Sequence, residues 1–277
     1  MSEEITKADV AAAKPDHLAG PAIAAKAEVV GIGKTTMSVS RMWWLAILAG
    51  LFIGTGALFM TYVKVDQSLS FAVASVFGAA MFSIGLILVV IAGAELFTGN
   101  SLMVIAALNK KITWGKLAKN WVVVYFGNLV GSLLLVLVIV GTGVMAMKAG
   151  DNTIGNQMVA VAAGKEALTP LAIFCRAIMC NFLVCLAVWM GFAGRTVIDK
   201  IVTCMFPVTA FVAMGFEHCV ANMFFLPMGT VASMMGYGSV GVLPIAGCFY
   251  NIAFATLGNI VGGALFVGIL YWLAYRK

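Results

Sequence analysis

The feature that most constrains this chain is an apolar run from Phe71 to Leu108 that contains one charged residue, Glu95. A membrane-spanning helix needs about 20 apolar residues to cross a hydrocarbon core of about 30 Å. At about 1.5 Å per residue, one straight helix over this run would be nearly twice too long. The run therefore predicts a membrane protein in which this span is interrupted.

Composition supports the same class. Of the 277 residues, 62% are hydrophobic and 10% are charged, whereas soluble domains carry about 25% charged residues. We predict an all-α membrane protein with six transmembrane helices, of which the second and fifth are broken. The expected spans are residues 42–63, 71–108, 121–145, 171–192, 201–235 and 245–275. Residues 1–40 are expected to form a polar N-terminal segment, and residues 41–277 one transmembrane domain.

The distribution of basic residues predicts the orientation in the lipid bilayer. With the N-terminus inside, thirteen basic residues fall on that side and three on the other, namely Lys64, Lys148 and Lys165. Cytoplasmic loops carry such an excess, so both termini are expected in the cytoplasm. The net charge of +6 then follows from membrane topology and indicates no nucleic-acid binding. Arg176 lies inside the fourth span, where we expect it to reach the interface or a subunit contact.

Two segments share one pattern. GAELFTGN (93–100) and GFEHCVAN (215–222) both read G-x-E-x-x-x-[G/A]-N and lie 122 residues apart (215 − 93). The third spans of the two halves also contain similar sequences, GNLVGSLLLV from Gly127 and GNIVGGALFV from Gly258. Three spans per half give the halves opposite orientations, so these marks predict inverted repeats. Irregular backbone inside a membrane survives only within protein or beside a water-filled cavity, which predicts a transport pathway at the breaks.

The residues of the repeated pattern suggest how each break is held. Gly93 permits the chain to leave the helix, and Asn100 and Asn222 are expected to bond the backbone groups that the breaks free. Glu95 and Glu217 are expected to brace the broken ends, because a carboxylate near a helix N-terminus accepts spare N–H groups.

Five stretches together resemble the formate/nitrite transporter family: GAELFTGN, KNWVVVYFGNLVGS (119–132), CNFLVCLAVWM (180–190), GFEHCVANMFFLPMG (215–229) and LGNIVGG (257–263). The resemblance covers residues 35–277, and the stretch from RTVIDK to FLPMG is most similar to the formate channels. It implies a homopentamer in a bacterial cytoplasmic membrane, with an aquaporin-like pore in each protomer. The implied substrates are small monovalent anions or their acids, such as formate, nitrite and hydrosulfide, with no cofactor and no metal.

The resemblance also implies a set of pore residues. His218 and Thr98 match the central site, Leu86 and Phe211 the inner constriction, and Phe82 the outer constriction. Five further positions match the family's pore region. The resemblance places Asn181 beside the outer constriction, Lys165 near the outer vestibule, Asn259 on the sixth helix, and Leu96 and Phe97 in the loop of the second helix. The N-terminal segment matches a helix that gates the inner mouth.

His218 is an ionisable residue inside a span, which is a functional position by default. An unperturbed histidine titrates near neutral pH. Protonated, it would attract an anion or pass a proton to formate, so that the neutral acid could cross apolar constrictions at a much lower energetic cost. We therefore expect a passive, pH-gated channel rather than an enzyme.

There are three alternatives to a formate channel, and the first two stay open. Within the family, nitrite or hydrosulfide could be the substrate, and a proton–anion symporter could replace the channel. A membrane enzyme or redox subunit is disfavoured because the sequence has no haem-type His pair, no Cys cluster and no nucleotide loop. The six cysteines are expected to be small packing residues.

Overall fold

The computed structural model describes residues 17–276 of the chain. The first part of the expected N-terminal segment, including Lys7 and Lys14, and the C-terminal Lys277 lie outside the described residues.

The described chain is mostly helical, and several of its long helices begin at side-chain caps. Ser or Thr precedes six of them and accepts a backbone N–H bond, namely at Ser38, Ser70, Thr113, Thr153, Thr169 and Thr196. The elements are α2 (Gly20–Thr36), α3 (Val39–Lys64), α4 (Phe71–Phe82), α5 (Ile84–Leu88), η1 (Val89–Gly93), η2 (Gly99–Met103), α6 (Val104–Leu108), α7 (Trp114–Thr142), η3 (Val144–Ala146), β1 (Lys148–Ala149), β2 (Asn152–Thr153), α8 (Ile154–Glu166), α9 (Pro170–Ala193), α10 (Val197–Ala213), α11 (Cys219–Met234), α12 (Ile245–Ile260), η4 (Val261–Ile269) and α13 (Leu270–Tyr275).

Within residues 17–276, five helical stretches are long and apolar enough to cross a membrane: Val39–Lys64, Phe71–Gly93, Trp114–Thr142, Pro170–Ala193 and Ile245–Tyr275. Two shorter apolar helices, Gly99–Leu108 and Cys219–Met234, complete the set. The expected long second region is thus divided between the stretch that ends at Gly93 and the one that begins at Gly99. The region expected as the fifth span is divided between α10 and α11.

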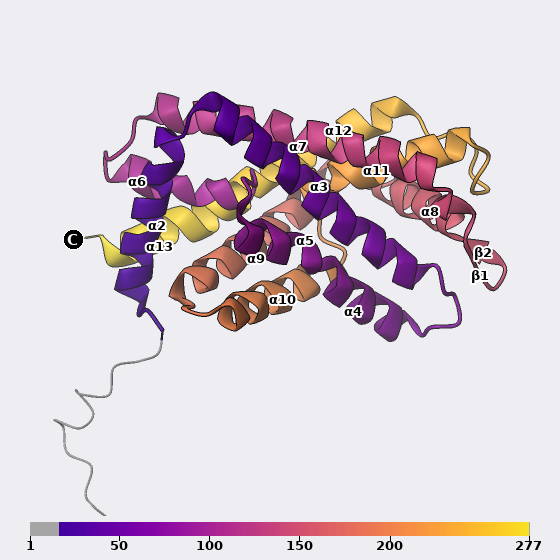
Figure 1. Ribbon diagram of the computed structural model, residues 1–277, viewed down its shortest axis with the longest axis horizontal. Helices are drawn as coiled ribbons and strands as arrows, with labels where there is room; N and C mark the ends of the chain where they lie inside the picture. The colour runs from indigo at the N-terminus through magenta and orange to yellow at the C-terminus, as the bar shows by residue number, and fades with distance from the viewer. Residues whose placement is uncertain (1–16, 277) are drawn as a thin grey trace, which may run out of the picture.

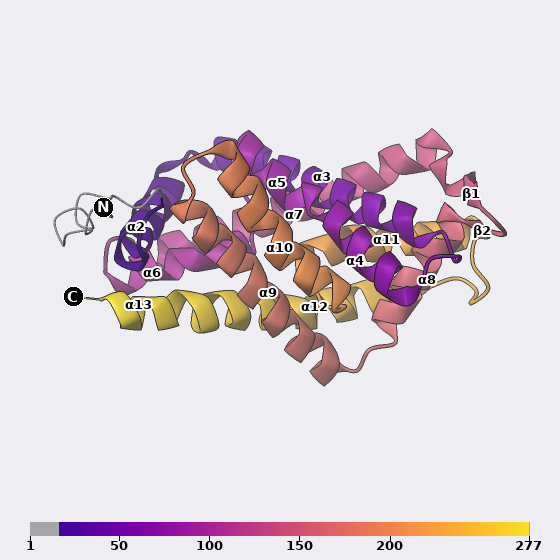
Figure 2. The same cartoon turned by 90° about the horizontal axis from the view of Figure 1, so that it is seen from below.

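The helices form an elongated bundle with two distinct ends (Figure 1). Figure 2 shows α2 and α13 at one end, which we call the terminal end. The β1–β2 hairpin lies at the opposite end, which we call the hairpin end.

Glycines bring the long helices into close contact. A Cβ atom on Gly131 of α7 would collide with the carbonyl oxygen of Ile47 on α3. In the same way, a Cβ atom on Gly262 of η4 would collide with the carbonyl oxygen of Ile178 on α9. Small residues let helix backbones approach in this manner in membrane proteins, so the two halves use the same kind of packing.

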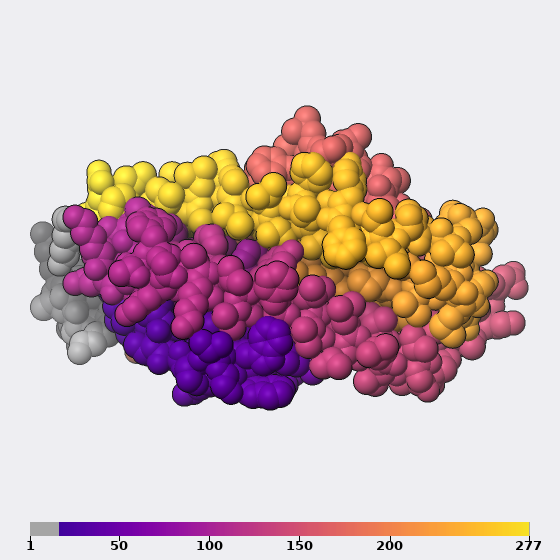
Figure 3. Space-filling model, turned by 90° about the horizontal axis from the view of Figure 1, so that it is seen from above, coloured from indigo at the N-terminus to yellow at the C-terminus, as the bar shows by residue number. Residues whose placement is uncertain are grey.

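In the view of Figure 3, the magenta α7 lies between the indigo α3 and the yellow C-terminal helices. An apolar surface covers much of the bundle. Its exposed side chains include Trp44, Leu48, Val122, Phe126, Leu134, Leu137 and Phe249. Lipid and partner subunits are the surroundings in which such a surface is stable.

The structure contains two features that were not predicted from the sequence. Helix α8 lies between the third and fourth long stretches, where only a loop was expected. Two π-helices, η1 and η4, interrupt the regular turns, and such segments are frequent at functional sites.

Candidate functional site

The first break separates η1 from η2. The chain leaves the helix at Gly93 with φ +83°, a conformation that glycine adopts at no steric cost. Asn128 of α7 then satisfies the freed backbone. Its Oδ1 accepts from the Phe97 N–H at 3.0 Å, and its Nδ2 donates to the carbonyls of Ala46 at 2.8 Å and Glu95 at 2.9 Å.

The second break repeats this arrangement between α10 and α11. Gly215 has φ +68°, and Asn259 of α12 takes the place of Asn128. Its Oδ1 accepts from the Cys219 N–H at 2.9 Å. Its Nδ2 donates to the carbonyls of Ala177 at 2.8 Å and Glu217 at 2.9 Å. The two breaks are therefore held by matching bonds in the two halves of the chain.

This differs from the expectation that Asn100 and Asn222 would bond the freed backbone. The Asn100 amide instead donates to the side chains of Glu95 and Asn120, both at 2.8 Å. Asn128 supplies the backbone bonds because it projects from a neighbouring helix into the gap. The repeated GN in GNLVGS and GNIVGG was the sequence signal for that role.

In the second half, the Asn222 amide likewise bonds side chains. Its Nδ2 donates to Glu217 at 2.7 Å and to Asn251 at 2.6 Å. The Asn251 amide in turn donates to Glu217 at 3.2 Å. Each carboxylate is thus oriented by side-chain amides, while the Phe97 and Cys219 N–H groups at the breaks are bonded by Asn128 and Asn259.

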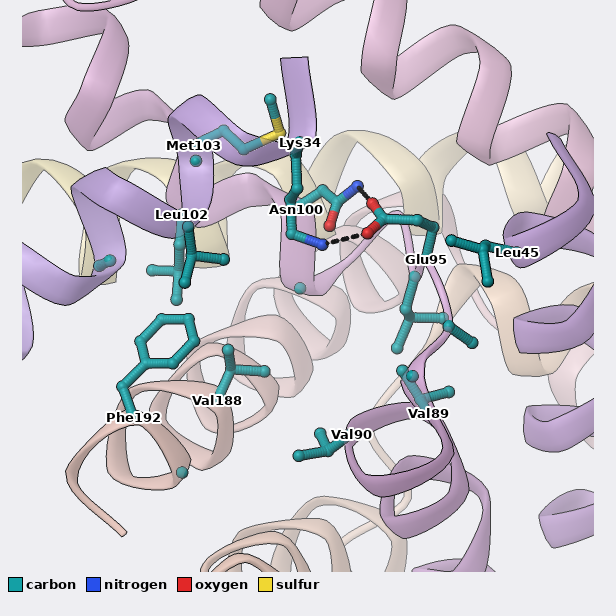
Figure 4. Close-up of a pocket in the computed structure, with 18 of the residues that line it drawn as sticks. Lys34, Leu45, Val89, Val90, Glu95, Asn100, Leu102, Met103, Val188 and Phe192 are labelled. Carbon is teal, nitrogen blue, oxygen red and sulfur yellow. Dashed lines mark hydrogen bonds and ion pairs between the residues drawn. The ribbon is translucent and has the colours of Figure 1, made fainter. Parts of the chain in front are cut away.

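Each buried carboxylate also forms an ion pair with a lysine. Glu95 is paired with Lys34 of α2 at 2.6 Å, and Glu217 with Lys165 of α8 at 2.8 Å. Figure 4 shows Glu95 bonded to both Lys34 and Asn100. The sequence reading missed Lys34, because nothing in the tail indicates that α2 returns to the first break. The pairing neutralises two carboxylates that would otherwise repel an anion.

His218 is the N-cap of α11 and is 3% exposed. Its Nδ1 accepts a bond from the Ala221 N–H at 3.0 Å, and its Nε2 lies 3.0 Å from Thr98 Oγ1. A backbone N–H can only donate, so Nδ1 holds a lone pair and the ring proton of the neutral histidine is on Nε2. Nε2 therefore donates to the Thr98 hydroxyl, which leaves the hydroxyl proton free for another acceptor.

A cavity of about 480 Å³ opens at the terminal end, and we call it the terminal-side cavity. Figure 4 shows its wall of apolar side chains, including Val89, Leu102 and Phe192. Four basic residues also line it, namely Lys26, Lys34, Arg41 and Lys200. The Lys26 ammonium donates a hydrogen bond to the Phe192 carbonyl at 3.0 Å.

A second cavity of about 240 Å³ approaches the breaks from the other side, and we call it the hairpin-side cavity. His218 lines it together with Phe82, Phe211 and Lys165. Both cavities therefore present positive charge around an apolar interior.

Apolar side chains separate the two cavities. Leu86 and Leu96 line the terminal-side cavity, and Phe82 and Phe211 line the hairpin-side cavity. The rings of Phe82 and Phe211 meet edge to face with centroids 6.0 Å apart. The Phe211 ring, near the end of α10, also stacks on His218, with centroids 5.9 Å apart. The expected grouping of Phe211 with Leu86 at an inner constriction stays a prediction.

Four predicted site residues line neither cavity and are buried: Thr98, Asn181, Asn259 and Phe97. Asn181 of α9 donates to the carbonyls of Thr98 at 3.2 Å and Asn259 at 2.6 Å. Phe97 packs edge to face on Tyr125, with ring centroids 5.1 Å apart. These side chains hold the backbone around the Thr98–His218 pair. Across residues 17–276, no three His, Cys, Asp or Glu side chains gather as a metal site.

Comparison with known proteins identifies the family. The profile of the formate/nitrite transporter family matches residues 21–273. The chain belongs to the formate/nitrite transporter family. This transporter is 41% identical to the formate channel FocA of Escherichia coli K12, over 95% of this chain and 96% of that protein. It is 40% identical to a probable formate transporter of Methanothermobacter thermautotrophicus, over 93% and 97% of the two chains.

Solved structures agree with this family. A pentameric formate channel with formate bound matches the transporter with a TM-score of 0.76 and 39% identity, covering 86% of this chain and 98% of that one. An ion channel of the same family matches with a TM-score of 0.81 and 29% identity, covering 91% and 98%. The transporter is therefore a multi-pass membrane protein with a channel fold.

Proposed function

We propose that this protein is a passive channel for formate and other small monovalent anions or their acids. The observation that carries the proposal is the Thr98–His218 pair, which lies between two cation-lined cavities and is flanked by apolar side chains. Positive cavities concentrate anions at both mouths. The pair then offers one hydroxyl donor at the point where the anion has lost most of its water.

The apolar side chains on either side favour a small, singly charged or neutral species. Leu86 and Leu96 on one side and Phe82 and Phe211 on the other offer no hydrogen bonds to a hydrated ion. Burying a bare carboxylate among such groups is very costly, so formate passes as a briefly dehydrated ion or as its acid. Hydrophobic constrictions of this kind also close by dewetting.

Protonation of His218 supplies a route to pH-dependent conduction. The second proton has to enter at Nδ1, which removes the bond from the Ala221 N–H and thus the cap of α11. Lys165 and Arg176 add positive charge around the ring from α8 and α9, and Glu217 offsets Lys165. We infer that acidification changes both the charge and the geometry of the second break.

The topology proposed is six crossings in two inverted halves, with α10 and α11 together forming the fifth. The matching amide bonds and ion pairs at the two breaks support this repeat. The excess of basic residues at the terminal end supports cytoplasmic termini in a bacterial inner membrane. The apolar surface of α7 and the pentameric relative support a homopentamer.

The test is anion flux into liposomes that contain the purified protein, with formate, nitrite and hydrosulfide supplied at two pH values. Wild type is compared with His218→Ala and with His17→Ala, which removes the exposed histidine far from the breaks. We expect formate to lead, and His218→Ala alone to lose the pH response. If the flux of nitrite or hydrosulfide exceeds that of formate, the proposed substrate is wrong. If proton uptake accompanies each anion against its gradient, the protein is a symporter.

A further inference from the structure

The hairpin-side cavity carries two basic side chains that the ion pairs at the breaks do not use. Lys64 is the last residue of α3, and Arg176 lies on α9. Both line the same cavity as His218, although they are distant from it in the sequence. Their charges therefore face the space through which an anion reaches the Thr98–His218 pair from this end.

The charge balance of the cavity depends on these two residues. Its lining contains three basic side chains and one carboxylate, Glu217. That carboxylate is 2.8 Å from Lys165, so the Lys165 charge is already compensated. Within residues 17–276, neither Lys64 nor Arg176 has a carboxylate within 4.0 Å. The uncompensated positive charge of the cavity is theirs.

Their hydrogen-bonding capacity is also largely unused. The Arg176 guanidinium has five N–H donors, and its one bond to a described residue is from Nη1 to the Gly215 carbonyl at 3.4 Å. The Lys64 ammonium makes no hydrogen bond to any residue in the described part of the chain. A carboxylate or a similar anion is the ligand that such donors accommodate.

The apolar walls around Lys64 and Arg176 strengthen the attraction of these two charges for an anion. Met60, Leu168 and Phe216 line the same cavity, whose volume is about 240 Å³. Charges in a narrow cleft with apolar walls focus the field and raise the local concentration of the opposite charge. Because Phe82 and Phe211 lie deeper, beside His218, an anion meets Lys64 and Arg176 before it must lose its water.

We propose that Lys64 and Arg176 form an anion-capture pair at the hairpin-side mouth. The inference rests on the proposed function and assigns to these residues the entry step from one side. These two residues determine the anion concentration at which entry from the hairpin end is half-saturated. The maximal rate of conduction is determined deeper in the protein, at the apolar constriction.

The conduction test uses planar bilayers with formate added on one side at a time. We expect Lys64→Gln and Arg176→Gln each to raise the half-saturating concentration from the hairpin side about three- to tenfold, with the limiting rate little changed. Entry from the terminal side should stay as in wild type. Arg176→Lys should have a half-saturating concentration close to that of wild type, since it keeps the positive charge.

Lys148→Gln is the matched control, because Lys148 is exposed on β1 at the same end and lies outside the cavity. If Lys148→Gln changes entry as much as the cavity variants do, general surface charge is responsible and the capture pair is overturned. A fall in the limiting rate at unchanged half-saturation overturns it as well, because the residues would then act in passage.

A second measurement does not depend on formate conduction. Leu168→Cys places a thiol in the cavity, in a background where the exposed Cys175 is replaced by serine. The rate of its modification by an anionic thiosulfonate reagent is divided by the rate for a cationic one. We expect this ratio to fall about tenfold in the Lys64→Gln/Arg176→Gln double variant.

The two measurements separate the possible failures. If wild type carries no formate, the proposed function fails, and the labelling ratio still decides the capture pair. An unchanged ratio in the double variant overturns the pair even if formate flux is high. A lowered ratio with unchanged half-saturation from the hairpin side also overturns the capture role.

Discussion

Lys34 and Lys165 occupy corresponding places in the two halves of the bundle, and each is paired with the carboxylate of its own break. The distances are 2.6 Å from Lys34 to Glu95 and 2.8 Å from Lys165 to Glu217. The lysines come from α2 and α8, which lie at opposite ends of the molecule (Figure 1). A helix of the N-terminal segment and a short helix that the sequence did not predict therefore perform the same structural task at the two ends of the pathway.

The Lys165–Glu217 pair should be strongly coupled. Glu217 is 2% exposed, so Lys165→Met would leave a buried charge without its partner and lower the free energy of unfolding by about 3–5 kcal/mol. The double variant Lys165→Met/Glu217→Gln should recover much of this loss. Thermal unfolding in detergent measures both changes. Equal losses in the single and double variants would show that the ion pair adds no coupling.

Asn259 should be as important for stability as a core residue. Asn259→Leu removes three bonds to backbone groups at the second break. Each buried group left without a partner costs about 1–3 kcal/mol, so unfolding should occur at clearly lower temperature. Asn128→Leu should behave alike. The exposed Gln67→Leu serves as the control, and a loss confined to one of the two asparagines would contradict the matching of the breaks.

Gly131 and Gly141 lie on the same helix, and substitution by alanine should destabilise the protein only at Gly131. Gly131→Ala adds a Cβ that collides with the Ile47 carbonyl, and overpacking of this kind costs about 1–3 kcal/mol. No neighbouring atom lies within 4 Å of a Cβ at Gly141. Gly141→Ala should therefore be neutral or stabilise α7 by about 0.5–1 kcal/mol. The stability of the two variants in detergent is the measurement, and equal destabilisation would refute the packing argument.

Thr98 should affect conduction more than stability. Thr98→Val keeps the shape but removes the hydroxyl that His218 holds in place. Loss of one such bond to a passing anion is worth about 1.4 kcal/mol, or about a tenfold fall in formate flux. Thr98→Ser should restore the flux. If Thr98→Val conducts as wild type does while its fold is intact, the hydroxyl has no part in passage.

Several features of the protein follow from its sequence because they depend on local composition. The apolar run around Glu95 requires an interruption whatever the tertiary arrangement, since bilayer thickness limits helix length. The interruptions lie where the repeated pattern predicts them, at Gly93 and Gly215. The family resemblance is confirmed by the match over residues 21–273.

Other features depend on contacts that no local pattern contains. Asn128 and Asn259 hold the breaks because α7 and α12 pass beside them, and Asn100 and Asn222 turn to the carboxylates instead. The position of Phe211 likewise depends on how α10 approaches α4.

The sequence by itself thus determined the membrane class, the breaks and the charged residues available to them, because bilayer thickness and charge burial act on every such chain alike. Only the tertiary structure decided the partners, Lys34 with Glu95 and Thr98 with His218, and brought Lys64 and Arg176 to the lining of one cavity. These pairings join residues far apart in the chain. Their formation depends on the directions in which separate helices cross, which helical periodicity alone does not specify.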